Sequence, residues 1–227
     1  MRRRTLEALN EARRTGRVIV RAVNLKSGDE RLVDPTSDTS PLGVEAARAA
    51  RADKSASIDV DDHEWFLDVY NPPLDLVIVG AAHIAQLLAT MARLIGYDVR
   101  IIDPRTAFAT VARFPGMVLS HEWPDEALSK SPLGPRSALV ALTHDPKVDD
   151  PALSAAIRSS AFYVGALGSR KTHAGRLERL KAQGFSDAEL GRIHGPIGLA
   201  IGAQSPAEIA VSILAEMTRD LRMDAAR

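Results

Sequence analysis

The sequence predicts a doubly wound α/β domain built on a parallel sheet and preceded by a small α+β domain. From Leu76 onward, short apolar runs alternate with segments whose apolar residues recur at helical spacing, which is typical of a parallel sheet. Upstream, short segments with strand character flank turn-forming residues instead. The pattern changes at Asn71-Pro72-Pro73, and proline favours an extended chain before it. We therefore expect domains at 1–73 and 74–227.

The N-terminal domain is expected to hold helices and strands but no motif that carries chemistry. A turn at Ser27-Gly28-Asp29 separates its first two strands. The expected helices span 5–14 and 44–51, and the expected strands span 18–23, 30–33, 57–60 and 65–70.

The C-terminal domain begins with the continuous apolar run from Leu76 to Val79, which is typical of a strand covered on both faces. A helix is expected over 84–95, where apolar side chains recur at helical spacing before Gly96. Asp150 followed by Pro151 has the pattern of an N-cap with proline at the first helical position, so we expect a helix to begin there. Further strands are expected at 99–102, 117–119, 138–142 and 161–167, and further helices at 150–158 and 170–181.

Composition argues against several classes of protein. The 227 residues include 29 lysines and arginines and 29 aspartates and glutamates, so bulk charge does not favour binding to nucleic acid or to a membrane. The chain has no cysteine, which excludes thiolate metal sites and a cysteine nucleophile. The six histidines lack the spacing of a metal site. No apolar run approaches the roughly 18 residues of a membrane-spanning helix. We therefore expect a cytoplasmic protein.

The first candidate binding motif is the turn Gly80-Ala81-Ala82-His83, between the first parallel strand and its helix. A Rossmann turn has glycine at its first position and a small residue where the backbone approaches a pyrophosphate, and Gly80 and Ala82 occupy these positions. Asp103 ends the next strand, where an acidic residue would meet a ribose hydroxyl. The alternative is a structural turn without a ligand, with His83 as an ordinary surface residue.

Two later loops carry further candidates. His144 and Asp145 follow a strand at the end where open α/β sheets bind ligands, although the same residues also suit a simple polar turn. Gly168, Ser169 and Arg170 open a helix, where glycine, hydroxyl and cationic groups suit an anion. The alternative for this loop is a solvated helix start.

The last motif is the glycine-rich and nearly uncharged stretch His194–Gly202. It runs into Ser205-Pro206-Ala207-Glu208, which has the pattern of a capping box with proline at the first helical position. A structural role is therefore expected for Glu208. For His194, both contact with a ligand and a structural role are possible interpretations.

Together and in this order, the motifs resemble the XdhC/CoxI family of maturation factors for molybdenum hydroxylases such as xanthine dehydrogenase and carbon monoxide dehydrogenase. The resemblance covers about residues 74–217. It implies a Rossmann-like fold and a protein that binds molybdenum cofactor, as molybdopterin or its dinucleotide form, and assists its sulfuration and insertion into the apo-enzyme. The matching stretches are Gly80–His83, Asp103–Arg105, Arg113–Pro115, Thr143–Asp145, Tyr163–Arg170 and His194–Leu199.

The resemblance also implies partners and site residues. The partners would be a molybdenum hydroxylase apo-enzyme, a cysteine desulfurase and a second copy in a homodimer, and the role is that of a cofactor-binding chaperone rather than a catalyst. No catalytic or metal-binding residue is expected. The expected cofactor-binding residues are Gly80, Ala82, His83, Asp103, Arg105, His144, Asp145, Gly168, Ser169, Arg170 and His194.

The sequence departs from the family pattern in two places. The family's usual Gly-Ala-Gly-His turn is Gly-Ala-Ala-His here, which narrows the room for a pyrophosphate. Residues 1–73 lack the Gly-Ser-x-Pro-Arg and Gly-Gly-Cys-like stretches that are common in the family, so this domain is divergent. Because the chain has no cysteine, it cannot itself carry a persulfide.

Two other functions use the same turn. One is an NAD(P)-dependent oxidoreductase, in which His144 would donate a proton near the hydride site. The other is a nucleotide-sensing module without chemistry.

Overall fold

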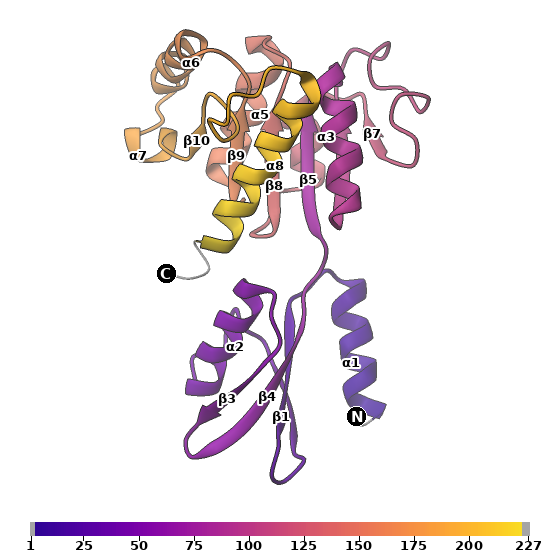
Figure 1. Cartoon of the computed structure of the whole chain (residues 1–227), viewed down its shortest axis with the longest axis vertical. Coiled ribbons are helices and arrows are strands. Elements are labelled where there is room, and N and C mark those ends of the chain that lie inside the picture. Colours follow the sequence, from indigo (N-terminus) through magenta and orange to yellow (C-terminus); the bar gives the residue numbers. More distant parts are fainter. Residues whose placement is uncertain (1–2, 224–227) are drawn as a thin grey trace. The chain divides into compact units, whose positions relative to one another are not determined.

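The computed structural model describes residues 3–223, which form two compact units (Figure 1). The first unit contains the described residues up to Pro72 together with Arg222 and Met223, and the second runs from Pro73 to Leu221. No helix among residues 3–223 combines the length and the apolar character that a membrane-spanning segment needs.

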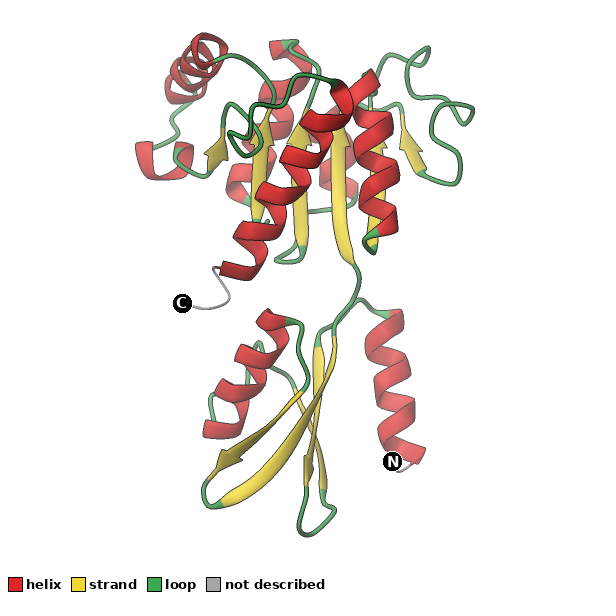
Figure 2. Ribbon diagram, in the orientation of Figure 1, coloured by secondary structure: helices red, strands yellow, loops and turns green. Residues whose placement is uncertain are grey.

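The first unit is built on a four-stranded antiparallel sheet (Figure 2). Its strand order is β2-β1-β4-β3, and helix α2 packs on one face, where Leu42 and Ala46 join a core with Val20 and Leu67. The predicted helices and strands of this segment are confirmed, with ends shifted by a few residues. The elements are α1 (Arg3–Arg14), β1 (Ile19–Asn24), β2 (Glu30–Val33), α2 (Pro41–Ala52), β3 (Ala56–Val60) and β4 (His63–Tyr70).

The second unit is built on a six-stranded parallel sheet, which confirms the predicted doubly wound α/β fold. The strand order is β10-β9-β8-β5-β6-β7, so the chain starts near the centre, winds to one edge and then returns to build the other half. The strands are β5 (Leu74–Val79), β6 (Tyr97–Ile102), β7 (Val118–Ser120), β8 (Ser137–Ala141), β9 (Tyr163–Ala166) and β10 (Ile193–His194). The helices are α3 (His83–Leu94), α4 (Pro124–Lys130), α5 (Pro146–Arg158), α6 (Arg170–Ala182), α7 (Asp187–Leu190) and α8 (Pro206–Met223).

Helices cover both faces of this sheet (Figure 2). Leu76 and Ile78 of β5 belong to a core shared with α3 and α8, whereas Val77 and Val79 belong to the opposite core, shared with α5. Successive side chains of a strand point to opposite faces, so a strand covered on both sides is apolar throughout. This explains the continuous apolar run in the sequence.

The predicted start of α5 at Asp150 is wrong. The helix begins at Pro146, and the Asp145 side chain caps it by accepting a hydrogen bond of 3.0 Å from the Lys147 N–H. Between Thr143 and Pro151 the Asp-Pro pattern occurs twice, at Asp145 and at Asp150, and the first of these copies opens the helix. Pro151 then lies in the second turn, where it removes one helical hydrogen bond without ending the helix.

Three short elements, α4, α7 and β10, were not predicted from the sequence, because each has too few residues to show a periodicity. The capping box predicted at the start of α8 is confirmed. The Glu208 N–H donates to Ser205 Oγ at 3.3 Å, and the Ser205 N–H donates to Glu208 Oε2 at 2.8 Å.

A buried polar network fixes α8 to the sheet. Tyr163, the first residue of β9, donates its hydroxyl to Glu216 Oε2 at 2.7 Å, and the Gly198 N–H donates to the same oxygen at 2.8 Å. His194 stacks on Tyr163 with ring centroids 4.6 Å apart, and its Nε2 lies 2.9 Å from Asp220 Oδ2. Burial, together with the bond to Glu216, raises the pKa of Tyr163 far above its usual range. The hydroxyl therefore stays protonated and acts as a donor.

This network predicts the effect of Tyr163→Phe. The variant should lower the free energy of unfolding by roughly 1–2 kcal/mol, because the buried Glu216 loses a hydrogen-bond donor. Tyr70→Phe is the matched control: its hydroxyl also donates to a carboxylate, Asp68, but at an exposed position, so we expect a change below about 0.5 kcal/mol. Urea denaturation followed by circular dichroism measures both. Equal losses in the two variants would contradict the structural role of the network.

Candidate functional site

The loops that follow the parallel strands lie side by side at the carboxyl-terminal ends of the strands. Backbone hydrogen bonds hold the strand ends together: the Leu142 N–H donates to the Val79 carbonyl and the Leu167 N–H to the Ala141 carbonyl, each at 2.8 Å. The loops after β5, β6, β8 and β9 therefore form one continuous rim, where open α/β sheets bind their ligands.

The turn after β5 requires glycine at its first position. Gly80 has a φ of 101°, and a Cβ placed on it would lie 2.5 Å from Thr143 Cγ2. The turns after β5 and β8 are thus in direct contact at this point. Ala82, by contrast, has φ −70° and ψ 175°, an extended conformation that any residue adopts. The alanine that replaces the family's second glycine therefore costs no backbone strain.

Asp103, at the end of β6, is fully buried and ties the turn after β5 to its own loop. The Ala81 N–H donates to its Oδ2 at 2.8 Å. Arg105 donates its backbone N–H and its Nε–H to Oδ1, at 3.0 and 2.9 Å, and its Nη2–H to Oδ2 at 2.8 Å. With both oxygens engaged and no exposed surface, Asp103 meets a ribose hydroxyl only if Arg105 first moves away.

Electrostatics favour this arrangement. Burial alone would raise the pKa of Asp103, but the hydrogen bonds from Arg105 and Ala81 outweigh it and hold the pKa below the usual range. The bond to Asp103 raises the pKa of Arg105 against the effect of its partial burial, and the carboxylates of Asp145 and Asp149 raise it further. Arg105 thus lies within electrostatic reach of the loop after β8, so the structure brings these predicted site residues together.

The helices that begin at this rim differ in how their first turns are capped. Asp145 caps α5, and Ser169 caps α6 by accepting a hydrogen bond of 3.1 Å from the Thr172 N–H. The N-cap of α3 is Ala82, which has no side-chain acceptor. The first N–H groups of α3 are therefore left uncapped by a side chain, at the positive end of a helix dipole. Among these three helix starts, α3 is the one that lacks a side-chain cap, and the N–H groups of an uncapped helix start can donate hydrogen bonds to an external anion.

The remaining predicted residues lie on the surface of the rim. His83 is the first residue of α3 and is exposed, as is His144, which has a left-handed φ of 64°. Gly168 has a φ of 146°, and Arg170 is the exposed first residue of α6. Within residues 3–223, no carboxylate pairs with Arg170.

Sequence reasoning missed a buried ion pair behind this rim. Arg176 of α6 and Asp149 of α5 are 2% and 1% exposed, and Arg176 Nη2 lies 3.6 Å from Asp149 Oδ2. Arg176 Nη2 also donates to the Leu167 carbonyl at 2.9 Å, while Thr143 Oγ1 donates to Asp149 Oδ1 at 2.6 Å. The pair therefore connects the loops after β8 and β9. No local pattern marks either residue as buried.

This pair is incompletely satisfied. Asp149 Oδ2, Arg176 Nε and Nη1, and the neighbouring His173 Nδ1 are buried and accept or donate no hydrogen bond within the described chain. Burial raises the pKa of Asp149 and lowers that of Arg176, and each charge partly offsets the other's shift. Burial and the charge of Arg176 lower the pKa of His173. Several buried polar atoms without a hydrogen-bond partner in the described chain therefore lie beneath the rim.

His194 ends β10 and pairs with Gly165 of β9, so its backbone lies at the carboxyl-terminal end of the strands, whereas its side chain packs on Tyr163. It contacts Tyr163, Glu216 and Asp220 in the network that holds α8, and Tyr163 stands at the opposite end of β9 from Gly168. Its observed contacts are those of a structural residue.

The role of Asp103 predicts a pH-dependent stability. Its folded pKa lies below the ordinary value of 3.8, so its stabilising effect is complete above that value and is lost as the pH falls toward the folded pKa. Asp103→Asn should cost roughly 2 kcal/mol at neutral pH, because hydrogen bonds to a charged group are lost. The difference in the free energy of unfolding between the variant and the unmodified protein should become smaller below about pH 4. Denaturation of both proteins across pH measures this. Asp98→Asn, at an exposed position of β6, is the control, and a difference that stays constant with pH would refute the interpretation.

Comparison with known proteins gives relatives for the second unit. The chain is 32% identical over 148 residues to the "Molybdenum cofactor insertion chaperone PaoD" of Escherichia coli, which covers 65% of this chain and 40% of that protein. It is 32% identical over 153 residues to a Bacillus subtilis protein described as a probable xanthine dehydrogenase subunit, covering 67% and 44%. It is 30% identical over 154 residues to the Escherichia coli protein YqeB, covering 67% and 28%. The chain thus matches less than half the length of each of these relatives.

A crystal structure described as a xanthine dehydrogenase from Bacillus halodurans has the same fold. It superposes with a TM-score of 0.75 at 24% sequence identity, over 99% of this chain and 68% of that one. The family model described as the XdhC Rossmann domain matches residues 76–217, which is more than half of the chain. The protein therefore belongs to the XdhC family.

Proposed function

We propose that this chain binds molybdenum cofactor at the rim of the parallel sheet and assists its insertion into a molybdenum hydroxylase apo-enzyme. Two findings support the proposal. The chain belongs to the XdhC family, and one relative is named a molybdenum cofactor insertion chaperone. The cofactor would be cargo that is held and released, so the residues described here bind and position it and need no catalytic group.

The observation that carries the proposal is the start of α3 without a side-chain cap. A pterin cofactor ends in a phosphate or a pyrophosphate, and the free N–H groups of a helix start bind such anions. Helix α6 begins two strands away, a distance of roughly 10 Å given the usual strand spacing, and places the cation of Arg170 at the same rim. The buried donors of Arg176 add further polar capacity. The residues present thus fit an anionic, polar cargo.

The finer features of the function are part of the proposal. Because the chain contains no cysteine, sulfuration of the cofactor would require sulfur from a partner, and we propose a cysteine desulfurase. We further propose a homodimer that acts in the cytoplasm and accepts molybdopterin or its dinucleotide form. The engagement of both Asp103 oxygens disfavours a ribose contact at this position, whether the ribose belongs to NAD(P) or to the dinucleotide form, because the usual acceptor is already bonded.

Ala82→Asp tests the α3 site directly. A carboxylate at this N-cap would occupy the N–H groups and repel a phosphate, so cofactor retention should fall roughly tenfold or more. The same change should raise the free energy of unfolding by about 1 kcal/mol, because it supplies the missing cap. Binding and stability therefore move in opposite directions, which a merely damaged protein would not show. Ala82→Ser, a neutral cap, is the matched control for side-chain size.

The measurement is molybdenum and pterin content after gel filtration of protein loaded with the cofactor, together with urea denaturation. Unchanged retention in Ala82→Asp would remove the α3 start from the site. Retention of NAD(P)H in place of the pterin would overturn the proposed function itself.

Arg170→Gln tests the second contact. Loss of one charged hydrogen bond to a phosphate should weaken retention of the cofactor roughly tenfold without changing stability, since Arg170 is exposed. Lys130→Gln removes the same charge at an exposed position at the far end of α4 and should leave retention unchanged. Equal effects in the two variants would show that only overall charge matters.

A further inference from the structure

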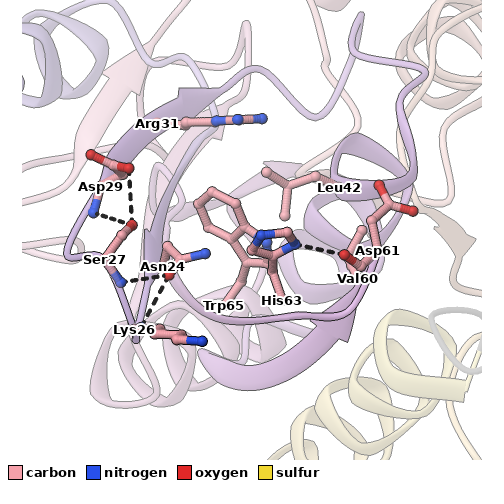
Figure 3. A pocket seen from close by; sticks show the side chains of 10 residues that line it. All are labelled: Asn24, Lys26, Ser27, Asp29, Arg31, Leu42, Val60, Asp61, His63 and Trp65. Carbon is pink, nitrogen blue, oxygen red and sulfur yellow. Dashed lines mark hydrogen bonds between the residues drawn. The ribbon is translucent and has the colours of Figure 1, made fainter.

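The first unit contains a hollow that has no counterpart in the sequence motifs. It has a volume of about 690 Å³, within the range of roughly 300–1,000 Å³ typical of small-molecule sites (Figure 3). It lies entirely within the first unit and outside residues 76–217, so it is independent of the rim and of the function proposed above. Its lining residues are Asn24, Lys26, Ser27, Asp29, Arg31, Leu42, Val60, Asp61, His63 and Trp65.

The hollow exists because α2 covers only part of its sheet face. At the usual rise, the 12 residues of α2 span about 18 Å, whereas the 8 residues of β4 span about 27 Å. The pairing register places Asn24 opposite Trp65 and Arg31 opposite Ala22, on the face that carries α2. Beyond the start of α2 at Pro41, this face continues without a helix above it.

The floor of the hollow is apolar and already packed. Trp65, Leu42 and Val60 are each at most 9% exposed and belong to the core of the unit. The floor is therefore preformed, and binding loses no free energy in ordering it. Figure 3 shows the Trp65 ring at the centre of the lining side chains.

Cationic groups border this aromatic floor. The guanidinium carbon of Arg31 lies 5.1 Å from the centroid of the Trp65 ring, and Lys26 stands on the turn between β1 and β2 (Figure 3). His63 is held at the edge of the hollow by a contact of 2.6 Å between its Nδ1 and the Asp61 carbonyl.

The hairpin turns that form the walls are fixed by local bonds. Asn24 Oδ1 accepts hydrogen bonds from the N–H groups of Lys26 and Ser27, at 3.0 and 2.8 Å. The Asp29 carboxylate accepts a hydrogen bond of 2.9 Å from Ser27 Oγ and is thereby drawn into the turn. Asp61 has a left-handed φ of 52° in the tight turn between β3 and β4. Two carboxylates, Asp29 and Asp61, and two cations, Arg31 and Lys26, line the hollow; Asp29 is bonded within its own turn, and Arg31 lies over the Trp65 ring.

We propose that this hollow binds a small planar aromatic molecule that carries an anionic group. The ring lies against Trp65, on the apolar floor that Trp65 forms with Leu42 and Val60. The anionic group points to Arg31 and Lys26, because charge-assisted hydrogen bonds to guanidinium and ammonium groups are the strongest available there. Because Arg31 already stacks over Trp65, it moves outward to admit the ring and then stacks on the outer face of the ring.

The intrinsic fluorescence of Trp65 tests this proposal in the full chain. The protein has two tryptophans, and Trp123→Phe leaves Trp65 as the single tryptophan, which excitation at wavelengths above the tyrosine absorption selects. The probes are two planar aromatic anions, guanosine monophosphate and nicotinate. Each has a neutral partner with the same ring, guanosine and nicotinamide, and inorganic phosphate and acetate are the anions without a ring.

We expect saturable quenching by at least one planar anion, binding roughly tenfold weaker for its neutral partner, and no quenching by phosphate or acetate. Arg31→Gln and Lys26→Gln should each lower the affinity for the planar anion roughly tenfold. Both residues are exposed, so the core that the floor belongs to stays intact. Lys54→Gln, an exposed lysine of the same unit outside the hollow, is the matched control and should bind as before.

Three results would overturn the proposal. The first is the absence of saturable quenching by both planar anions up to millimolar concentration. The second is equal affinity for a planar anion and its neutral partner, which would remove Arg31 and Lys26 from recognition. The third is an equal loss of affinity in Lys54→Gln, which would reduce the effect to overall charge. None of these results bears on the cofactor at the rim, because no probe is a pterin and the variants lie in the other unit.

Discussion

The buried carboxylate of Asp103 is the interaction on which the rim of the parallel sheet depends. It accepts hydrogen bonds from the turn after β5, through Ala81, and from its own loop, through Arg105. A buried charge that loses its hydrogen bonds is costly, so these two loops cannot move apart without a large penalty. The start of α3 is thereby held in place, and no side chain caps its first turn, where the Ala85 N–H donates to the Ala82 carbonyl at 3.1 Å. Asp103 is thus a positioning residue.

The helices that start at this rim are of two kinds, those with a side-chain N-cap and those without one. Asp145 and Ser169 satisfy the first turns of α5 and α6 from within the chain, and Ala82 leaves the first turn of α3 open. The missing family glycine is therefore less disruptive than the motif suggests, because the backbone at Ala82 is extended.

The buried ion pair of Asp149 and Arg176 carries a desolvation cost. The attraction within a buried pair seldom offsets its desolvation, and here several polar atoms also lack hydrogen-bond partners among the described residues. The shifts in pKa agree, because burial raises that of Asp149 and lowers that of Arg176. Their geometry nevertheless joins the loops after β8 and β9 through Thr143 and Leu167. The pair therefore orders the rim while it lowers stability.

The sequence alone determined the parts of this protein that depend on local patterns. The apolar run before Gly80, the turn that follows it and the capping box at Ser205 were predictable, because strand burial, tight turns and helix caps involve neighbours in the chain. The Asp-Pro pattern gave the wrong start for α5 because two copies lie five residues apart there, and local chemistry does not show which of them caps the helix. Only the tertiary structure decided that the side chains of Asp103 and Arg176 are buried. It also decided that His194 contacts Asp220 of α8 and that Trp65 forms the floor of a hollow in the first unit. Each of these depends on residues far apart in the sequence, which meet only when the sheets form.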